Sequence, residues 1–533
     1  MKLLRRGAIA LSLANLCYLQ AWWQLLAYKK ADTFKMVVPP DAAQYLALLA
    51  MVFFQALLFF LAASLAARKK GRFAALGRTI FFLVLLIPLD NTKQFVFQLC
   101  RVFRHDFLRN TAPNLFFIVP VIVVAILINY NRSVWESRVV RAASVILLLC
   151  FPLVGLVIAR VAYKIATYDA RPFRNGPTAA LLPVPAGQPR VIVALYDEWD
   201  YRLSFEDRKP GVTLPNIDRL RQESLFGTNV HSTMRDTILS VPSLLTGEEV
   251  ADLRYEDVSE ANVRFAGQTT WVDFGQFPNL FTKARAAGVN AAVIGWYIPY
   301  CRLFSKDLVY CDWTPVATRY NTQGASFAED LLNEPRSLVE LNMDTELEVK
   351  ILSPFGQPLE TQRRAKTYQK EQRELLEKAV DPQIGLLYVH FGAPHSPYFY
   401  NSRTGQFDLN TMSASGYLQN LALVDRSVSE LRQRLEAAGL WDTTTLLLIA
   451  DHSYRTSRRL DGKTDPRVPF ILKMAGSREG VTLNFPFNSL LTQQLLLGIL
   501  EKRISTTQEA AQWIGSQAEK QSPSLRTRTF KYN

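Results

Sequence analysis

Arg190-Val-Ile-Val-Ala-Leu-Tyr196, followed by Asp197-Glu198, is the stretch that decides the fold. A continuous apolar run of this length predicts a strand buried on both faces, as in a parallel sheet. Similar runs recur at residues 290–296, 384–391, 444–450 and 469–474. Helical patterns lie between the runs, at residues 216–222, 279–287, 360–380 and 417–438. Strands that alternate with helices predict an α/β domain with a mostly parallel sheet covered on both faces.

Acidic and imidazole side chains follow several of these strands. Asp197 and Glu198 follow the first run, and His390 ends the third. Asp451 and His452 follow the fourth. Because the carboxyl ends of parallel strands meet at one edge of a sheet, we expect these groups to gather there.

Several segments from residue 190 to about residue 476 resemble, in the same order, the sulfatase-like members of the alkaline phosphatase superfamily. The likeness is carried by Val191 to Glu198, Leu214-Pro-Asn-Ile-Asp-Arg-Leu-Arg-Gln-Glu-Ser-Leu-Phe226, Thr237 to Gly247, Tyr388-Val-His-Phe-Gly-Ala-Pro-His-Ser-Pro-Tyr398, Gly439 to His452, and Arg467 to Lys473. The resemblance implies an α/β/α sandwich with a metal-dependent site for sulfate or phosphate esters.

Thr237 stands where the resemblance places the nucleophile, ten residues ahead of the glycine that closes Leu244-Leu-Thr-Gly247. A threonine hydroxyl is a weak nucleophile at neutral pH unless its pKa is lowered, and a divalent cation bound to its oxygen does this. One imidazole among oxygen ligands fits Zn²⁺ or Mn²⁺, and we expect one such ion. The expected ligands are Asp197, Glu198, Thr237, Asp451 and His452, with the choice between the two neighbouring acids left open.

His390 and His395 are expected to face the anionic group, as hydrogen-bond donors or as the acid for the leaving oxygen. A second metal is possible if both contribute. Basic residues further on are more often solvated surface charges than anion ligands. These are Arg455, Arg458, Arg459 and Lys463. The family usually has Gly after its Asp-His pair, whereas this chain has Ser453.

The nucleophile segment departs from the sulfatases that carry formylglycine. Their signature is Cys/Ser-x-Pro-x-Arg, and the matching positions here read Thr237-Ile-Leu-Ser-Val241. Threonine resembles the phosphotransferring branches, namely the lipoteichoic acid synthases and the lipid A phosphoethanolamine transferases. Those branches also place several membrane spans before an external catalytic domain, which is an analogy of layout.

Five apolar stretches in the first third are each about long enough to cross a bilayer as a helix. They cover roughly residues 7–26, 42–67, 79–97, 114–130 and 142–163. Basic residues before the first span and in two loops favour a cytoplasmic N-terminus, so the rest lies outside the cytoplasm. We therefore expect a multi-pass protein of the bacterial inner membrane with a periplasmic or extracellular catalytic domain. The expected parts are a membrane domain at 1–164, a Pro-rich linker at 165–189, the catalytic domain at 190–505 and a basic polar tail at 506–533.

The chain has a net charge of +14. Its basic residues do not form a stripe interleaved with aromatic residues, which is the pattern that binds nucleic acid. Much of the excess lies beside the apolar stretches, where anionic lipid headgroups are the simpler partner. Cys301 and Cys311 close a short loop in the external domain. A disulfide there suits an oxidising compartment, and two buried thiols are the alternative.

The sequence thus favours a membrane-bound phosphotransferase or phosphoric ester hydrolase acting on envelope lipid or glycan esters through a covalent threonine intermediate. A sulfuric ester hydrolase is the alternative within enzymes. A catalytically silent, membrane-tethered binding protein is the alternative outside them.

Overall fold

The computed structural model describes residues 2–27, 34, 38–66, 132–315, 326–340, 357, 359–409, 411 and 413–530. The chain divides into two compact units. An N-terminal unit takes residues 1–29, 38–170 and 319–344, and a catalytic unit takes residues 30–37, 171–318 and 345–533. Each unit therefore includes a segment from within the sequence of the other.

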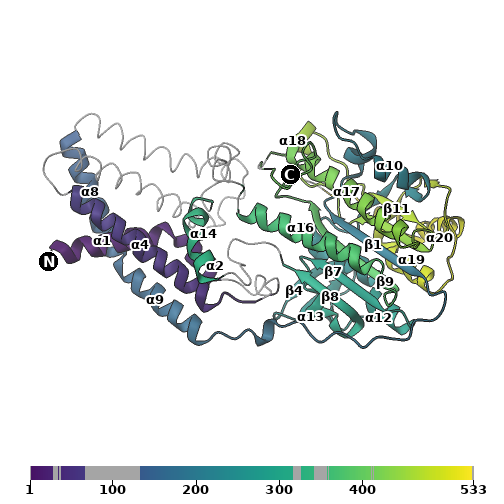
Figure 1. The fold of residues 1–533 in the computed structure, drawn as a ribbon, viewed down its shortest axis with the longest axis horizontal. Coiled ribbons are helices and arrows are strands. Elements are labelled where there is room, and N and C mark those ends of the chain that lie inside the picture. The colour runs from purple at the N-terminus through teal and green to yellow at the C-terminus, as the bar shows by residue number, and fades with distance from the viewer. Residues whose placement is uncertain are drawn as a thin grey trace. The chain divides into compact units, whose positions relative to one another are not determined.

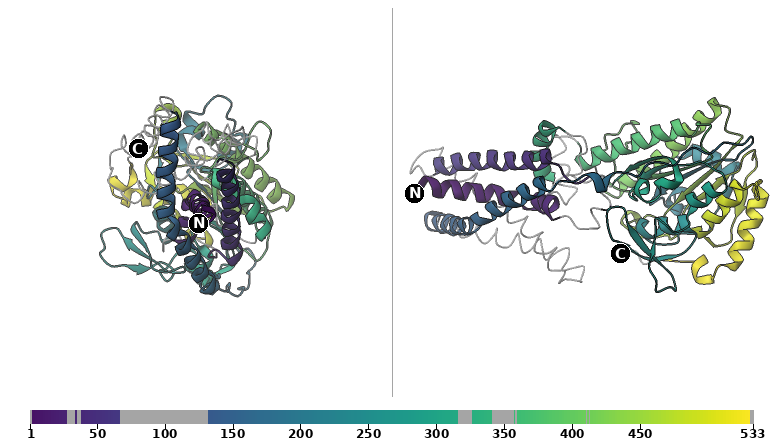
Figure 2. Two further views of the ribbon diagram at one scale, coloured as in Figure 1. Left: turned by 90° about the vertical axis from the view of Figure 1, so that its left-hand side faces the viewer. Right: turned by 90° about the horizontal axis from the view of Figure 1, so that it is seen from below.

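The N-terminal unit is helical. Helix α1 contacts α4, α8 and α9, and α14 contacts α4; Figure 2 shows α1 and α4 running side by side. Its core is apolar and includes Leu13, Trp22 and Leu48. The helices are α1 (Lys2–Cys17), α2 (Leu19–Leu26), α4 (Ala42–Ala66), α8 (Arg132–Leu149), α9 (Phe151–Ala166) and α14 (Phe327–Glu340).

Two helical stretches among the described residues are long and apolar enough to cross a membrane, Ala42–Ala62 and Arg141–Ala166. They correspond to the second and fifth expected spans. The first expected span is not one helix, because the chain breaks at Tyr18 between α1 and α2. The third and fourth expected spans, residues 79–97 and 114–130, lie outside the described residues. Within the described residues, two of the five expected spans therefore qualify by length and composition.

The catalytic unit is built on an eight-stranded sheet in the order β12-β2-β11-β10-β1-β9-β7-β8 (Figure 1). Strands β10, β1, β9, β7 and β8 are parallel, and β11 pairs antiparallel with β10 and β2. The predicted mostly parallel sheet is confirmed. The strands are β1 (Arg190–Asp197), β2 (Leu225–Gly227), β7 (Ala291–Trp296), β8 (Leu308–Thr314), β9 (Leu386–Pro394), β10 (Thr444–Ala450), β11 (Phe470–Lys473) and β12 (Val481–Leu483).

Helices cover the sheet in two groups, which makes the unit an α/β/α sandwich. Helix α17 contacts α10, α16 and β9, while α19 contacts α11, α12, α20 and β1. The first group consists of α10 (Pro215–Gln222), α16 (Leu359–Lys378) and α17 (Ser415–Ala437). The second group consists of α11 (Thr237–Thr246), α12 (Leu280–Ala286), α19 (Thr492–Leu500) and α20 (Thr507–Lys520).

Smaller elements complete the unit. Strands β3 (Val230–His231) and β13 (Phe487–Asn488) form one pair, and β4 (Val250–Tyr255), β5 (Ala261–Phe265) and β6 (Val272–Asp273) form a three-stranded sheet. The short helices are α13 (Tyr300–Leu303), α18 (Arg458–Asp461) and α21 (Pro523–Arg526), with single turns at Arg171–Phe173, Arg202–Glu206, Ser305–Asp307 and Ser489–Leu491.

The segments that precede and follow the sheet in the sequence also pack against it. In the Pro-rich segment, Ala179 N donates to Leu308 O and Leu182 N donates to Asn290 Oδ1. In the segment expected to be a polar tail, α20 buries Ala510 and contacts β2 and β12.

Strand register explains why polar side chains meet at one edge of the sheet. Tyr196 of β1 pairs with Ala450 of β10, so the next residues, Asp197 and Asp451, leave the sheet side by side. On the other side of β1, Leu195 pairs with His390 of β9. Paired residues of neighbouring strands point to the same face, so these side chains share one face at the carboxyl end.

Candidate active site

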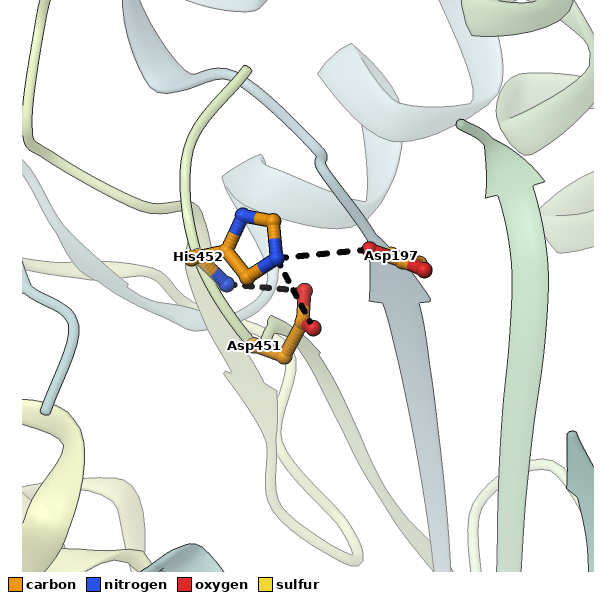
Figure 3. A group of neighbouring side chains, drawn as sticks. All are labelled: Asp197, Asp451 and His452. Atoms are coloured by element: carbon orange, nitrogen blue, oxygen red, sulfur yellow. Dashed lines mark hydrogen bonds and ion pairs between the residues drawn. The ribbon is translucent and has the colours of Figure 1, made fainter. Parts of the chain in front are cut away.

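Asp197, Asp451 and His452 form a group of three potential metal ligands at this edge, which we call the buried acid group (Figure 3). His452 Nε2 lies 3.4 Å from Asp451 Oδ2 and 3.6 Å from Asp197 Oδ1. All three side chains are almost completely buried. One ligand atom from each lies within 4.8 Å of the others, which is a spacing that one ion can bridge.

The hydrogen bonds of the buried acid group leave lone pairs aimed at its centre. His452 Nδ1 lies 3.0 Å from the Ser453 carbonyl oxygen, which accepts and never donates, so Nδ1 carries a proton and Nε2 is the nitrogen that faces the two carboxylates. Within the described residues, Asp197 Oδ2 and Asp451 Oδ2 are buried without a hydrogen-bond partner. Burial and the adjacent charge of Asp451 raise the pKa of Asp197 well above its usual range. Two crowded carboxylates and an imidazole nitrogen that faces them fit a divalent cation, which satisfies all three.

Thr237 is the first residue of α11 and lies directly beside this group. Its Oγ1 is 3.2 Å from His452 Nε2 and 3.5 Å from Asp197 Oδ1. Asp236 is the N-cap, with extended backbone angles, and Ser240 Oγ donates to the Asp451 carbonyl oxygen, which ties the helix to the end of β10. At the other end Gly247 has a φ of 71°, a conformation that glycine adopts without strain. The spacing read from the sequence is thus a ten-residue helix with a left-handed C-cap.

Glu198, the alternative acid, is not part of the buried acid group. Its φ of 63° is unusual for a residue with a side chain. This turn separates its carboxylate from that of Asp197, while its backbone N–H donates to Asp451 Oδ1 at 3.2 Å. The Tyr417 hydroxyl donates to the Glu198 carbonyl oxygen and fixes the turn from α17. Of the two adjacent acids, the structure therefore brings Asp197 to the candidate metal position.

The Glu198 carboxylate instead binds Arg455, at the centre of a second cluster that we call the arginine group. Arg455 Nε donates to Glu198 Oε1 at 2.6 Å, Nη1 donates to Asp236 Oδ1 at 2.8 Å, and Nη2 donates to His395 Nε2 at 3.2 Å. The Arg455 side chain is 30% exposed. Sequence reasoning favoured a solvated surface charge for this arginine over an anion ligand. The sequence did hold one signal that distinguishes Arg455 from the other basic residues: it lies three residues after His452, on the same loop.

His395 is neutral in this arrangement. Its Nδ1 faces the Ser396 carbonyl oxygen and must donate to it, while its Nε2 accepts from Arg455. Desolvation lowers the pKa of His395, which agrees with the neutral form. In this state the ring offers no proton at Nε2, so a role as acid requires the bond to Arg455 to be exchanged for another.

His390 lies buried on β9, where its Nδ1 is 2.9 Å from the Tyr300 hydroxyl. Burial lowers its pKa to about 4, so the ring is neutral at neutral pH. Its Nε2 has no hydrogen-bond partner among the described residues. Tyr300 was not found by sequence reasoning. It directly precedes Cys301, which forms the expected disulfide with Cys311 of β8 and so links α13 to the sheet.

The remaining basic side chains lie where surface charges are expected. Arg458 and Arg459 are exposed on α18. Lys463 is 64% exposed and pairs with Asp207. Within the described residues, none of these three forms a hydrogen bond or ion pair with either group, whereas Arg455 binds Asp236, the residue before Thr237.

Comparison with known families gives one match. The model of the family described as Sulfatase matches residues 191–490, more than half of the 533-residue chain. This range contains Thr237, the buried acid group and the arginine group. A comparison with curated proteins gives no match.

Solved structures with related folds include enzymes acting on different esters. The crystal structure of Ps i-CgsB in complex with k-i-k-neocarrahexaose is 14% identical, with a TM-score of 0.41 over 60% of this chain and 74% of that one. The phosphonate monoester hydrolase of Agrobacterium radiobacter is 16% identical, with a TM-score of 0.37 over 59% and 74%. The PsFucS1 sulfatase from Pseudoalteromonas sp. is 13% identical, with a TM-score of 0.37 over 62% and 74%. At these scores the resemblance adds nothing to the family match.

Proposed function

Because this chain belongs to the sulfatase family, and is thereby a metal-dependent enzyme of sulfate or phosphate esters, we propose that it is a membrane-bound phosphotransferase or phosphoric ester hydrolase. In this proposal Thr237 takes a phosphate-alcohol group from an envelope lipid or glycan ester and holds it as a covalent intermediate. The group then passes to an acceptor hydroxyl or to water.

The position of the Thr237 hydroxyl is the observation that carries the proposal. Its Oγ1 lies at the start of α11, within 3.5 Å of both His452 Nε2 and Asp197 Oδ1. Asp197, Asp451 and His452 are the residues that would hold a divalent cation. Such an ion, Zn²⁺ or Mn²⁺ by the donor set, lowers the pKa of a nearby hydroxyl and neutralises charge on the transferred group.

The two half-reactions balance in bonds and protons. Attack by Thr237 Oγ1 forms an oxygen–phosphorus bond and breaks the bond from phosphorus to the donor alcohol. The hydroxyl proton of Thr237 is lost and the departing alcohol gains one. In the second half-reaction an acceptor hydroxyl forms the bond to phosphorus and gives up its proton. The bond from Thr237 Oγ1 to phosphorus breaks, and Thr237 Oγ1 regains a proton. The N–H groups at the start of α11 favour the anionic intermediate.

Phosphate is favoured over sulfate by the nucleophile itself. The segment Thr237-Ile-Leu-Ser-Val241 has no residue that can become formylglycine at the nucleophile position, and no Pro or Arg at the other signature positions. A threonine hydroxyl attacks a phosphorus centre and forms a stable ester. This supports transfer or hydrolysis of phosphate esters.

A membrane setting is supported by the surface of the N-terminal unit. Helix α4 carries Phe53, Phe54 and Leu61 with about half of each side chain exposed, and Leu156 of α9 is 64% exposed. Exposed apolar bands of this kind suit contact with lipid. The disulfide of the catalytic unit suits an oxidising compartment outside the cytoplasm. A reporter that is active only outside the cytoplasm, fused to the C-terminus, is expected to be active.

The decisive experiment is to trap the intermediate on the full-length protein in detergent. After acid quenching in the presence of a phospholipid or glycan phosphodiester, we expect peptide mass spectrometry to show an adduct on Thr237, and its mass names the transferred group. The Thr237→Ala variant should retain metal but lose turnover. Turnover by Thr237→Ala would contradict the covalent mechanism, and cleavage of a sulfate ester supplied in place of the phosphodiester would favour the sulfuric ester alternative.

A further inference from the structure

The C-terminal segment, residues 521–530, reaches back to the helix that carries Thr237. Arg528 Nη1 donates to the Thr233 carbonyl oxygen at 2.9 Å, and Nη2 donates to Glu249 Oε2 at 2.9 Å. Arg528 Nη1 also lies 2.9 Å from Glu249 Oε1, so the guanidinium meets both oxygens of that carboxylate. Thr233 lies four residues before Thr237, and Glu249 lies just after α11 ends. One cation thus joins the chain that enters the nucleophile helix to the chain that leaves it.

The backbone of Arg528 is held independently of its side chain. His231 Nδ1 donates to the Arg528 carbonyl oxygen at 2.9 Å. Asn488 is fully buried, and its Nδ2 donates to the carbonyl oxygens of Ser232 and Leu525 at 3.1 and 3.0 Å. A chain terminus is poorly ordered unless contacts of this kind tie it down. The C-terminal segment is therefore fixed to the same stretch of chain that its guanidinium holds.

Two other contacts hold α11 from the side of the candidate site. Ser240 Oγ donates to the Asp451 carbonyl oxygen. Arg455 Nη1 donates to Asp236 Oδ1. Arg528 differs from both, because it binds the chain before and after the helix and comes from a segment that supplies no residue to the site. A shift of the nucleophile by about 1 Å is enough to cost roughly a hundredfold in rate, so a contact that sets the place of the helix governs the rate without touching a reacting atom.

We propose that Arg528 is a positioning residue for Thr237, because it holds the chain on both sides of α11 and thereby keeps Thr237 Oγ1 beside the buried acid group. The inference rests on the proposed function, in which Thr237 is the nucleophile. The Arg528 and Glu249 side chains are 21% and 24% exposed, so water screens this ion pair only in part. A chain without the C-terminal segment keeps every candidate metal ligand and loses the geometry that the attack needs.

The test compares Arg528→Met with Arg526→Met in the full-length protein in detergent with its metal. Arg526 has the same charge and lies on α21, and among the described residues its side chain makes no hydrogen bond or ion pair. With bis(4-nitrophenyl) phosphate as substrate, Arg528→Met should lower kcat about 10- to 100-fold, with KM and metal content unchanged. Arg526→Met should behave as the wild type does. An unchanged kcat in Arg528→Met, or an equal loss in the two variants, would overturn the inference.

Two further variants separate positioning from a general loss of folding. Arg528→Lys should recover part of the lost kcat, because an ammonium reaches Glu249 or the Thr233 carbonyl oxygen but does not bind both as a guanidinium does. Glu249→Gln keeps the bond to Thr233 and weakens the pair, so it should lower kcat about threefold. Added to Arg528→Met, Glu249→Gln should cause no further loss, since both remove the same contact. Additive losses, or no recovery in Arg528→Lys, would contradict the inference.

Hydrogen–deuterium exchange keeps this inference distinct from the proposed function. Peptides that cover residues 231–249 are followed by mass spectrometry in the metal-loaded protein without substrate. Arg528→Met should raise their exchange several-fold and Arg526→Met should not, and equal exchange in the two variants would overturn the inference. If exchange rises in Arg528→Met but the wild type cleaves no ester, the proposed function fails and the hold on α11 stands. If the wild type cleaves esters and exchange rises with no change in kcat, the positioning role fails alone.

Discussion

Two clusters of acids and imidazoles flank Thr237, and they treat positive charge in opposite ways. The buried acid group holds two carboxylates and one imidazole, with two carboxylate oxygens unpartnered among the described residues. The arginine group contains the same kinds of acid and imidazole but brings its own cation, and every one of its charged members has a partner. One cluster is built to receive a cation from solution, and the other supplies one from the sequence.

The difference teaches how to tell a metal ligand from an ion-pair partner when both are acids at a strand end. Asp197 and Glu198 are neighbours in sequence, and both are nearly fully buried. What separates them is the direction of the backbone at Glu198, which sends its carboxylate to the guanidinium. Burial alone does not separate the two acids, whereas an unpartnered oxygen beside an imidazole makes Asp197 the candidate ligand.

The largest effect is expected from removing a charge of the buried acid group. Asp451→Asn should lower turnover by roughly 10³-fold or more, because the cation that activates the nucleophile is no longer held. Elemental analysis of the purified full-length protein should show loss of the metal. The exposed Asp442→Asn variant is the control. Full metal content in Asp451→Asn would break the distinction between the two groups.

Removal of the metal by a chelator tests, through the thermal stability of the protein, whether the two groups are independent. A metal that binds the folded chain at 100 to 1,000 times its Kd stabilises it by roughly 3–4 kcal/mol, so a chelator should lower the Tm of the wild type. Arg455→Met should show the same drop, since its buried acid group is intact. Asp451→Asn should show none. A drop that disappears in Arg455→Met would mean that the two groups act as one site.

Lys473 offers a third case, a buried cation whose ammonium donates to the carbonyl oxygens of Trp441 and Thr444. Desolvation lowers its pKa to about 8 from the ordinary 10.5. Between these values the unfolded chain binds a proton that the folded chain does not, so its contribution to stability rises with pH by roughly 2–3 kcal/mol. Thermal unfolding from pH 8 to 10.5 should show this rise in the wild type and not in Lys473→Met. Lys520→Met, at an exposed position, should behave as the wild type does.

The smallest effect is expected from Glu198→Gln, and it distinguishes an anchor for Arg455 from a metal ligand. If Glu198 anchors Arg455, the variant should keep its metal and lose about tenfold in kcat/KM, because one charge-assisted hydrogen bond becomes a neutral one. Loss of metal in this variant would instead make Glu198 a ligand, as the sequence allowed. The metal content and the kinetics of the same preparation give both answers.

The sheet was predictable because each parallel strand is an apolar run long enough to be seen alone. All five predicted strands and the four predicted helices of the catalytic unit are present, with bounds that differ by a few residues. Strands of two or three residues, such as β2 and β12, carry no such pattern, because their hydrogen bonds come from partners distant in sequence. The antiparallel direction of β11 likewise depends on the path of the chain and not on its composition.

The residues of the candidate site that directly follow a strand were predictable from the sequence. The residues that loops from distant parts of the chain bring together were not. Asp197, Asp451, His452 and Thr237 are brought together as the sequence indicated. The arginine group was missed, because Arg455 becomes special through contacts with three other segments. Tyr300 was missed for the same reason, since its bond to His390 joins residues ninety positions apart. The roles assigned to all of these residues remain predictions until the variants are measured.

The two units cannot be divided by a single cut, because each contains chain from the other. Phe34 is 1% exposed in the core of the catalytic unit, with its ring centroid 4.5 Å from that of Tyr255, and its carbonyl oxygen accepts a hydrogen bond from Arg302. Helix α14, from the middle of the catalytic sequence, packs instead with α4. A soluble fragment that begins at residue 190 would lack the phenylalanine, at a cost of about 3–5 kcal/mol for the empty space, and would carry a helix with no surface to cover. Expression and purification therefore have to keep the N-terminal and catalytic units together in one chain.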